Sequence, residues 1–271
     1  MDRKKLIVVK VGTSTLTHDS GKPNLHRLDA LARALSDLKN AGDEVILVSS
    51  GAIAVGASKL NMQSKPTELE DKQAAAAVGQ CELMHIYDKL FSEYGCTVGQ
   101  ILLTGEDVEH PARRRNLLNT FRALLNMGAV PVVNENDSVS FDEIEAGAAR
   151  VFGDNDALSA IVAKLVGADL LVLLTDTDGL YDCDPRQNPD ARAIPVVTEI
   201  TDAVRACAGG AGTARGRGGM QTKLKAAELC MQAGIETVIA SGECPGNLFD
   251  IVNGAGIGTR FIPQTKTEVR A

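Results

Sequence analysis

The sequence predicts an α/β fold, a three-layer αβα sandwich with a mainly parallel central sheet, formed by a single domain over residues 1–271. Short apolar runs rich in Val, Ile and Leu alternate along the chain with longer segments of helical pattern, as in parallel sheets that are covered by helices. The apolar runs are nearly continuous, which is typical of strands buried on both faces. Several helical segments end at a glycine, such as Gly42, Gly128 and Gly167, where helices commonly terminate.

The expected strands and helices follow one another in regular alternation. The apolar runs predict strands at residues 6–11, 44–49, 97–103, 130–134, 170–174 and 237–240. The helical pattern predicts helices at residues 25–41, 71–94, 113–127, 156–166 and 220–233. No Pro-rich or Ser-rich linker divides the chain, so we expect two lobes that share one sheet, with a boundary near residue 167.

The composition is that of a globular protein and argues against several classes of function. Apolar residues make up 44% and charged residues 23%, and 28 basic and 35 acidic residues give a net charge of −7. This acidic balance disfavours a nucleic-acid-binding protein, and 3% aromatic residues with no Trp disfavour a stacking platform for bases. No apolar run is long enough for a signal peptide or a membrane span. The six cysteines form no Cys-x-x-Cys pair, so we expect neither a zinc site nor a disulfide scaffold, and a cytoplasmic location.

Polar residues follow the ends of four predicted strands, at residues 10–12, 49–51, 134–137 and 175–176. In an open parallel sheet, ligands bind outside the carboxyl ends of the strands. We therefore expect these four segments to line one site. Gly51 would let the backbone approach a ligand closely, although residues 49–51 are also compatible with a simple helix cap.

Two basic segments have the composition of a phosphate site. Lys10 interrupts the first strand next to Gly12 and three hydroxyl residues, and a buried lysine needs a partner or an anion; an edge lysine that reaches solvent is the alternative. Residues 209–223 contain six glycines, Arg215 and Arg217 but no acidic residue, and they lead into a helix that carries Lys223. This combination is typical of a loop that grips phosphate, and a flexible linker is the alternative.

Short acidic and amide side chains form two clusters, at residues 134–137 and 154–156. They suit a polar, cationic or metal-bearing ligand, although capping of one helix would account for part of the second cluster. Without His, these oxygen ligands favour Mg²⁺ carried by a nucleotide over a transition metal. We therefore expect no metal held by the protein alone.

The sequence lacks the motifs of three common enzyme classes. It has no Gly-x-x-x-x-Gly-Lys-Ser/Thr motif and no Gly-x-Gly-x-x-Gly after the first strand, so neither a P-loop enzyme nor a dinucleotide oxidoreductase is predicted. The four His form no pattern with a Ser or Cys nucleophile, which argues against triad hydrolysis. Phosphoryl transfer to a carboxylate would need no general base, only charge neutralisation and in-line positioning.

Taken in chain order, seven segments resemble the glutamate 5-kinases of the amino acid kinase family. The resemblance implies the amino acid kinase fold and ATP-dependent phosphorylation of the side-chain carboxylate of L-glutamate to L-glutamyl 5-phosphate, the first step of proline biosynthesis. It also implies Mg²⁺ dependence, a homo-oligomer (a dimer or tetramer) and feedback inhibition by proline. The segments that carry the resemblance are residues 10–14, 48–56, 131–139, 152–160, 174–181, 184–186 and 218–223.

The resemblance also implies roles for individual residues. Lys10 and Lys223 match the lysines that stabilise the transferred phosphoryl group, and Asp156 matches the aspartate that orients these lysines. The glutamate site is expected in the lobe 1–167, at Ser50, Gly51, Asp137, Asp154 and Asn155. The ATP site is expected in the lobe 168–271, at Thr175, Asp176, Arg217, Gly218, Gly219, Met220, Gln221, Thr222 and Lys223.

Two segments depart from the family pattern. Arg217 stands where Thr is usual, and residues 141–150, in the region that resembles the glutamate and proline loop, are longer and more charged than usual. Many relatives carry a further C-terminal PUA domain, and none is expected after residue 263. The alternatives are a family member that acts on carbamate, acetylglutamate, aspartate or uridylate, and a non-catalytic sensor of an amino acid or a nucleotide.

Overall fold

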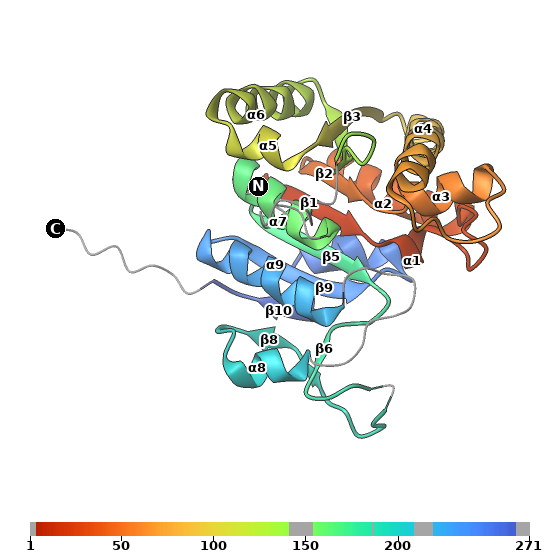
Figure 1. Ribbon diagram of the computed structural model, residues 1–271. Helices are drawn as coiled ribbons and strands as arrows, with labels where there is room; N and C mark the ends of the chain where they lie inside the picture. The colour runs from red at the N-terminus through yellow and green to blue at the C-terminus, as the bar shows by residue number, and fades with distance from the viewer. Residues whose placement is uncertain (1–3, 141–153, 186, 209–218, 264–271) are drawn as a thin grey trace.

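An eight-stranded sheet forms the centre of the molecule (Figure 1). The structure is a computed structural model that describes residues 4–140, 154–185, 187–208 and 219–263. In chain order, the strands of this sheet are β1 (Leu6–Val11), β2 (Glu44–Ser49), β3 (Thr97–Leu103), β4 (Ala129–Glu135), β5 (Leu170–Thr175), β8 (Val196–Val197), β9 (Glu236–Ser241) and β10 (Thr259–Phe261). Across the sheet they lie in the order β3-β4-β2-β1-β5-β9-β10-β8. Among these described strands only β9 and β10 pair antiparallel, so the mainly parallel sheet is confirmed.

Helices cover both faces of the sheet and complete the three predicted layers. One face carries α2 (Leu25–Asn40), α4 (Leu69–Glu93) and α10 (Leu248–Val252), and the other carries α6 (Pro111–Asn126), α7 (Asn155–Val166) and α9 (Met220–Gln232). The buried apolar side chains accordingly form two clusters, one on each side of the sheet. The connections contain the short helices α1 (Thr13–Leu16), α3 (Ala52–Lys59), α5 (Gly105–Glu109), α8 (Asp202–Cys207) and η2 (Pro245–Asn247).

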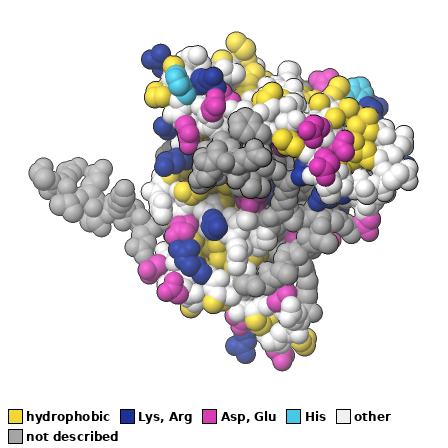
Figure 2. All heavy atoms as spheres, viewed as in Figure 1, with side chains coloured by type: hydrophobic (Ala, Val, Ile, Leu, Met, Phe, Trp, Pro, Cys, Tyr) yellow, Lys and Arg dark blue, Asp and Glu magenta, His cyan; other side chains and the backbone are white. Residues whose placement is uncertain are grey.

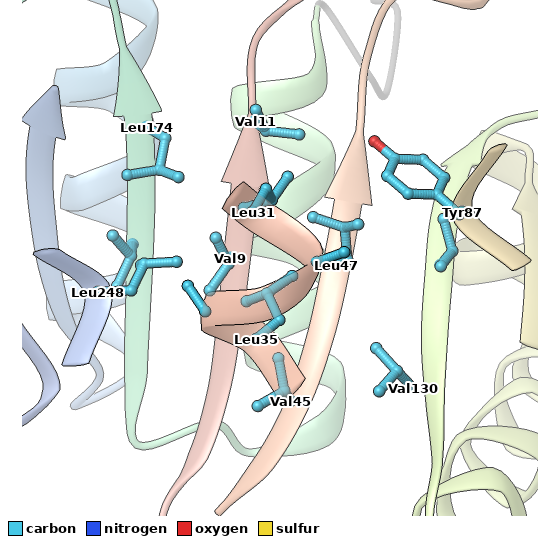
Figure 3. Close-up of a cluster of buried hydrophobic side chains, with 14 of the residues drawn as sticks. Val9, Val11, Leu31, Leu35, Val45, Leu47, Tyr87, Val130, Leu174 and Leu248 are labelled. Atoms are coloured by element: carbon cyan, nitrogen blue, oxygen red, sulfur yellow. The ribbon is translucent and has the colours of Figure 1, made fainter. Parts of the chain in front are cut away.

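Strand β1 lies in the middle of the sheet and is buried on both faces. Val9 and Val11 share a hydrophobic cluster with Leu35 of α2 (Figure 3). Val8 belongs to the other cluster, on the side of α7 and α9. Because side chains alternate along a strand, Lys10 is directed to the same side as Val8. The alternation along β1 thus decides which helices Lys10 can reach.

The predicted elements are confirmed with small differences at their ends. The strands at residues 6–11, 44–49 and 97–103 agree to the residue, and every other predicted strand or helix agrees to within two residues at each end. The helix-ending glycines Gly42, Gly128 and Gly167 all have positive φ angles. One expectation is wrong: β3 is an edge strand rather than a strand covered on both faces, and its Thr97 and Gln100 are exposed.

The structure adds short elements that the sequence pattern does not predict. The strands β6 (Leu180–Tyr181) and β7 (Ala193–Ile194) form a separate antiparallel pair, and two residues are too few for a periodic pattern. All six cysteines are free thiols, as their spacing predicts. Among the described helices, none combines the length and the apolar character needed to cross a membrane. On the face shown in Figure 2, acidic and basic side chains are interspersed with apolar ones.

Helices α3 and α4 cross with their backbones in contact. A Cβ atom added at Gly56 would lie 1.7 Å from the carbonyl oxygen of Ala75, and one added at Gly79 would lie 1.8 Å from the carbonyl oxygen of Ala52. Neither position can therefore carry a side chain unless the two helices separate.

Gly79→Ala is expected to lower the free energy of unfolding by about 1–3 kcal/mol, the usual effect of overpacking. Gly256→Ala is a matched control, because a Cβ atom at Gly256 meets no atom within 4 Å, and it should change stability by at most about 0.5 kcal/mol. Urea unfolding followed by circular dichroism measures both variants. A Gly79→Ala protein as stable as the wild type would show that the crossing can widen freely.

Candidate active site

A cavity of about 520 Å³ lies at the carboxyl ends of β1, β2, β4 and β5. All four polar segments of the sequence contribute to it, so the prediction that they meet at one site is confirmed. Strand β1 has β2 on one side and β5 on the other, and a crevice forms where an open sheet changes its winding direction in this way. The lining residues from the strand ends are Lys10, Gly12, Ser50, Gly51, Asn134, Glu135, Asp137, Thr175 and Asp176.

Three buried charged side chains meet in this cavity. The Nζ atom of Lys10 lies 2.6 Å from Oδ1 of Asp156, and the Nζ atom of Lys223 lies 3.2 Å from Oδ2 of Asp156. The exposed fractions are 7% for Lys10, 5% for Lys223 and 1% for Asp156. Two ammonium groups therefore share one buried carboxylate. A solvent-facing lysine at the sheet edge, the alternative for Lys10, is excluded because β1 is a central strand.

The fold brings this trio together from three distant parts of the chain. Lys10 leaves β1 on the side of α7, and Asp156 is the second residue of α7. Asp154 caps α7 by accepting hydrogen bonds from the amides of Asp156 (2.8 Å) and Ala157 (3.0 Å), as its residue type favours. Lys223 lies in the first turn of α9, which packs against α7. The starts of two helices thus meet beside the end of the central strand.

The two lysines keep Asp156 ionised although it is buried. Burial acts to raise the pKa of this carboxyl group, but the charges of Lys10 and Lys223 outweigh burial and lower its pKa from 3.8 to about 2. The trio consists of two cations and one anion, so its own charge is positive. Because charge is poorly screened in a buried site, the trio favours the binding of an anion in the cavity.

Thr222 contacts the same carboxylate. Its Oγ1 atom lies 2.7 Å from Oδ2 of Asp156 and 2.8 Å from the carbonyl oxygen of Gly219. A hydroxyl group has one proton to donate, and a charged acceptor forms the stronger bond. The sequence predicts Thr222 in the ATP site, and the structure places its hydroxyl group against Asp156.

The residues predicted for glutamate lie together at the cavity, since all five of them line it: Ser50, Gly51, Asp137, Asp154 and Asn155. Gly51 has a φ angle of 95° and precedes α3, which has no side-chain cap. Only glycine adopts this backbone conformation readily. The first amides of α3 are therefore oriented to bind an anion.

A buried amide network that the sequence pattern does not reveal supports this part of the site. The Nδ2 atom of Asn155 lies 2.9 Å from the Ser49 carbonyl oxygen, 3.0 Å from Ser50 Oγ and 3.0 Å from Asn134 Oδ1. Asn134 in turn donates from its Nδ2 to Oε1 of Gln80 in α4 at 2.9 Å. The network links α4 to the floor of the cavity.

The residues predicted for ATP are described in part. Thr175 and Asp176, at the end of β5, line the cavity, and Thr175 Oγ1 donates to Asp176 Oδ1 at 3.0 Å. Arg217 and Gly218, like residues 141–150, lie outside the described residues.

The start of α9 adjoins this part of the site. The N-cap of α9 is Gly219, so no side chain caps the helix, and Met220 and Gln221 are its first two residues. Amides at an uncapped helix start bind anions well. This arrangement places backbone amides that can donate hydrogen bonds to a phosphate within one turn of Lys223.

The oxygen atoms around the cavity suit Mg²⁺ that is already bound to phosphate. Within the described ranges, no group of three or more His, Cys, Asp or Glu side chains gathers into a metal site. Mg²⁺ usually keeps several waters and binds one or two carboxylates together with substrate phosphates. The cavity carboxylates of Asp154 and Asp176 could supply such contacts to a nucleotide complex.

A sequence model of the amino acid kinase family matches residues 5–241. This chain belongs to the amino acid kinase family. It is 54% identical over 260 residues to glutamate 5-kinase of Clostridium perfringens (strain 13 / Type A), covering 96% of both chains. It is 50% identical over 261 residues to glutamate 5-kinase of Listeria monocytogenes serovar 1/2a, covering 96% of this chain and 94% of the relative.

A solved structure supports the amino acid kinase fold as well. The chain is similar to carbamate kinase from Giardia lamblia bound to AMP-PNP, with a TM-score of 0.67 and 18% identity. The similarity covers 97% of this chain and 99% of the other. The fold class implied by the sequence motifs is therefore confirmed.

The stability of this amino acid kinase should depend on Asp156 at acid pH. A carboxyl group with a lowered folded-state pKa stabilises the fold above its unfolded pKa, and this contribution is lost as the pH falls through the folded pKa. For Asp156 the loss runs from about pH 4 to about pH 2 and amounts to about 2 kcal/mol. Urea unfolding across this range measures it.

The Asp156→Asn variant should not show this loss of stability between about pH 4 and about pH 2. At neutral pH the variant should be less stable than the wild type by about 3–5 kcal/mol, because two buried ammonium groups lose their counter-ion. Asp190→Asn, at an exposed position, is the control and should behave as the wild type. An unchanged acid dependence in Asp156→Asn would contradict the assignment.

Proposed function

We propose that this chain is an ATP-dependent kinase that phosphorylates the side-chain carboxylate of L-glutamate to L-glutamyl 5-phosphate, the first step of proline biosynthesis. The observation that carries the proposal is the pair of buried ammonium groups on Asp156, which leaves positive charge at the cavity. The relatives named glutamate 5-kinase, at 50% and 54% identity over nearly the whole chain, support glutamate as the acceptor.

The reaction requires positioning and charge neutralisation rather than proton transfer. The acceptor carboxylate is ionised at neutral pH, so one of its oxygens can attack the γ-phosphorus directly. A new bond between this oxygen and phosphorus forms while the bond from phosphorus to the β,γ-bridging oxygen breaks, and ADP leaves. Lys10 and Lys223 would contact the oxygens of the transferred group. Asp156 holds both ammonium groups in place before the reaction begins, so little reorganisation is needed.

The helix starts divide the cavity between the two substrates. We assign the uncapped start of α9, together with Thr175 and Asp176, to the phosphates of ATP. We assign the uncapped start of α3, after Gly51, to a carboxylate of glutamate. The polar side chains of Asp137 and Asn155, which also line the cavity, would bind the ammonium group.

The same assignment gives each lobe its part in the reaction. Residues 1–167 would bind glutamate and residues 168–271 would bind ATP, and the two lobes share one sheet because β1 pairs with β5. Mg²⁺ would enter with ATP and neutralise charge on the phosphates. We further propose a cytoplasmic homo-oligomer, a dimer or tetramer, that proline inhibits through the glutamate site.

Trapping of the acyl phosphate with hydroxylamine tests the acceptor. With ATP and Mg²⁺, L-glutamate should give the hydroxamate with a kcat/KM at least about 10²-fold above those of L-aspartate, glutarate and N-acetylglutamate, because each of these leaves a polar group of the site unpaired or misplaced. If N-acetylglutamate were turned over as efficiently as glutamate, glutamate would not be the specific acceptor. Binding of ATP and glutamate without turnover would indicate a sensor.

Lys10→Ala and Lys223→Ala should each lower kcat by about 10²–10³-fold, with smaller changes in KM, because the lysines stabilise charge in the transition state. Lys225→Ala is the matched control, since Lys225 lies on the same helix and is exposed, and it should keep the wild-type kcat. Unfolding curves establish that each variant is folded. A folded Lys223→Ala protein with unchanged turnover would exclude the proposed role of Lys223.

A further inference from the structure

We propose that Gln80 is a positioning residue for the acceptor part of the site, an inference that rests on the proposed function. Gln80 lies in the middle of α4, outside all the sequence motifs that predict the site. It acts through Asn134, which holds the carboxamide of Asn155 at the cavity. Three amide side chains from α4, β4 and α7 thus form one relay.

A backbone carbonyl group determines which way each of the three amide groups is turned. The Ser49 carbonyl oxygen can only accept a hydrogen bond, so the group of Asn155 that faces it must be Nδ2. The same Nδ2 atom contacts Asn134 Oδ1, so Asn134 must turn its own Nδ2 towards Gln80 Oε1. Only one orientation of the three amides satisfies all of these contacts.

Gln80 is the member of the relay that lies farthest from the cavity, and it accepts the hydrogen bond of Asn134. The exposed fractions are 8% for Gln80 and 2% for Asn134, so water does not readily replace their hydrogen bond. Without the Gln80 acceptor, the Asn134 Nδ2 atom would be buried without a partner, a state that proteins avoid. Asn134 would then rotate or shift, and Asn155 would lose its Oδ1 contact.

The Oδ1 atom of Asn155 is the part of the relay that a ligand in the cavity can contact. The Nδ2 atom of this residue is occupied by Ser49 and Asn134, while among the described residues no donor bonds Oδ1, and Oδ1 is not a fully buried atom. Because Asn155 lines the cavity, its Oδ1 is an acceptor available to a ligand. An acceptor of this kind suits the ammonium group of an amino acid. Gln80 therefore affects the acceptor substrate rather than ATP.

Steady-state kinetics of Gln80→Met tests the inference, because methionine has a similar shape but no amide acceptor. The KM for glutamate should rise about tenfold, while kcat and the KM for ATP change by less than about twofold. Tyr87→Phe is the matched control. Tyr87 lies two turns further along α4, and its hydroxyl group, directed to the end of β2 in Figure 3, lies 2.9 Å from Ser49 Oγ. Since the Ser49 side chain does not line the cavity, Tyr87→Phe should keep the KM for glutamate.

A double-mutant cycle identifies the route of the effect. In an Asn155→Ala background, Gln80→Met should raise the KM for glutamate by less than about twofold further, because the relay has lost its last member. Independent, multiplying effects would overturn the inference, as would a Gln80→Met protein with the wild-type KM. If Gln80→Met does not fold, Gln80→Leu, which also removes the amide acceptor, replaces it under the same criteria. A wild-type protein inactive on glutamate would instead overturn the proposed function.

Discussion

An ammonium group can be buried only beside opposite charge, and in this chain Asp156 serves two such groups at once. Its two carboxylate oxygens receive Lys10 from one side and Lys223 from the other. Each of the three residues belongs to a different element, so β1, α7 and α9 must lie in one relative arrangement for both ammonium groups to reach the same carboxylate. The precision of the site follows from this electrostatic constraint, since removal of Asp156 would leave two buried ammonium groups without a counter-ion.

The sheet supplies the frame for this constraint. Parallel strands place their carboxyl ends at one edge, and the position of β1 between β2 and β5 opens a crevice there. Side-chain alternation along β1 then sends Val9 and Val11 to the α2 side and Lys10 to the α7 side. On the remaining wall, the close crossing at Gly56 and Gly79 holds α3 against α4. The cavity is thus bounded by elements that cannot shift independently.

The sequence was sufficient for the parts that depend on local chemistry. Continuous apolar runs located the inner strands, and glycines with positive φ angles ended the helices. Lys10 is notable as a lysine in an apolar strand, and Lys223 follows a glycine-rich basic segment. The role of Asp156 follows only from the resemblance to the amino acid kinase family, because acidic residues are common at helix starts. The edge position of β3 was missed, because an apolar run does not say which neighbours a strand has.

Gln80 shows the limit of a local pattern more clearly. Its partner Asn134 is 54 residues away, and only tertiary structure brings the two together. The available signal was a polar residue on the helix stripe that also carries the buried Leu83 and Tyr87. Without the fold, such a residue could equally have been a solvated break in that stripe.

The pairing of β5 has a consequence for how the molecule forms during synthesis. β5 lies between β1, near the start of the chain, and β9, which the ribosome adds more than 60 residues later. Until β9 emerges, the nascent polypeptide carries an apolar strand with one open edge, and until α9 emerges Asp156 lacks its second cation. A chain divided between β5 and α9 would therefore separate β5 from β9 and Asp156 from Lys223.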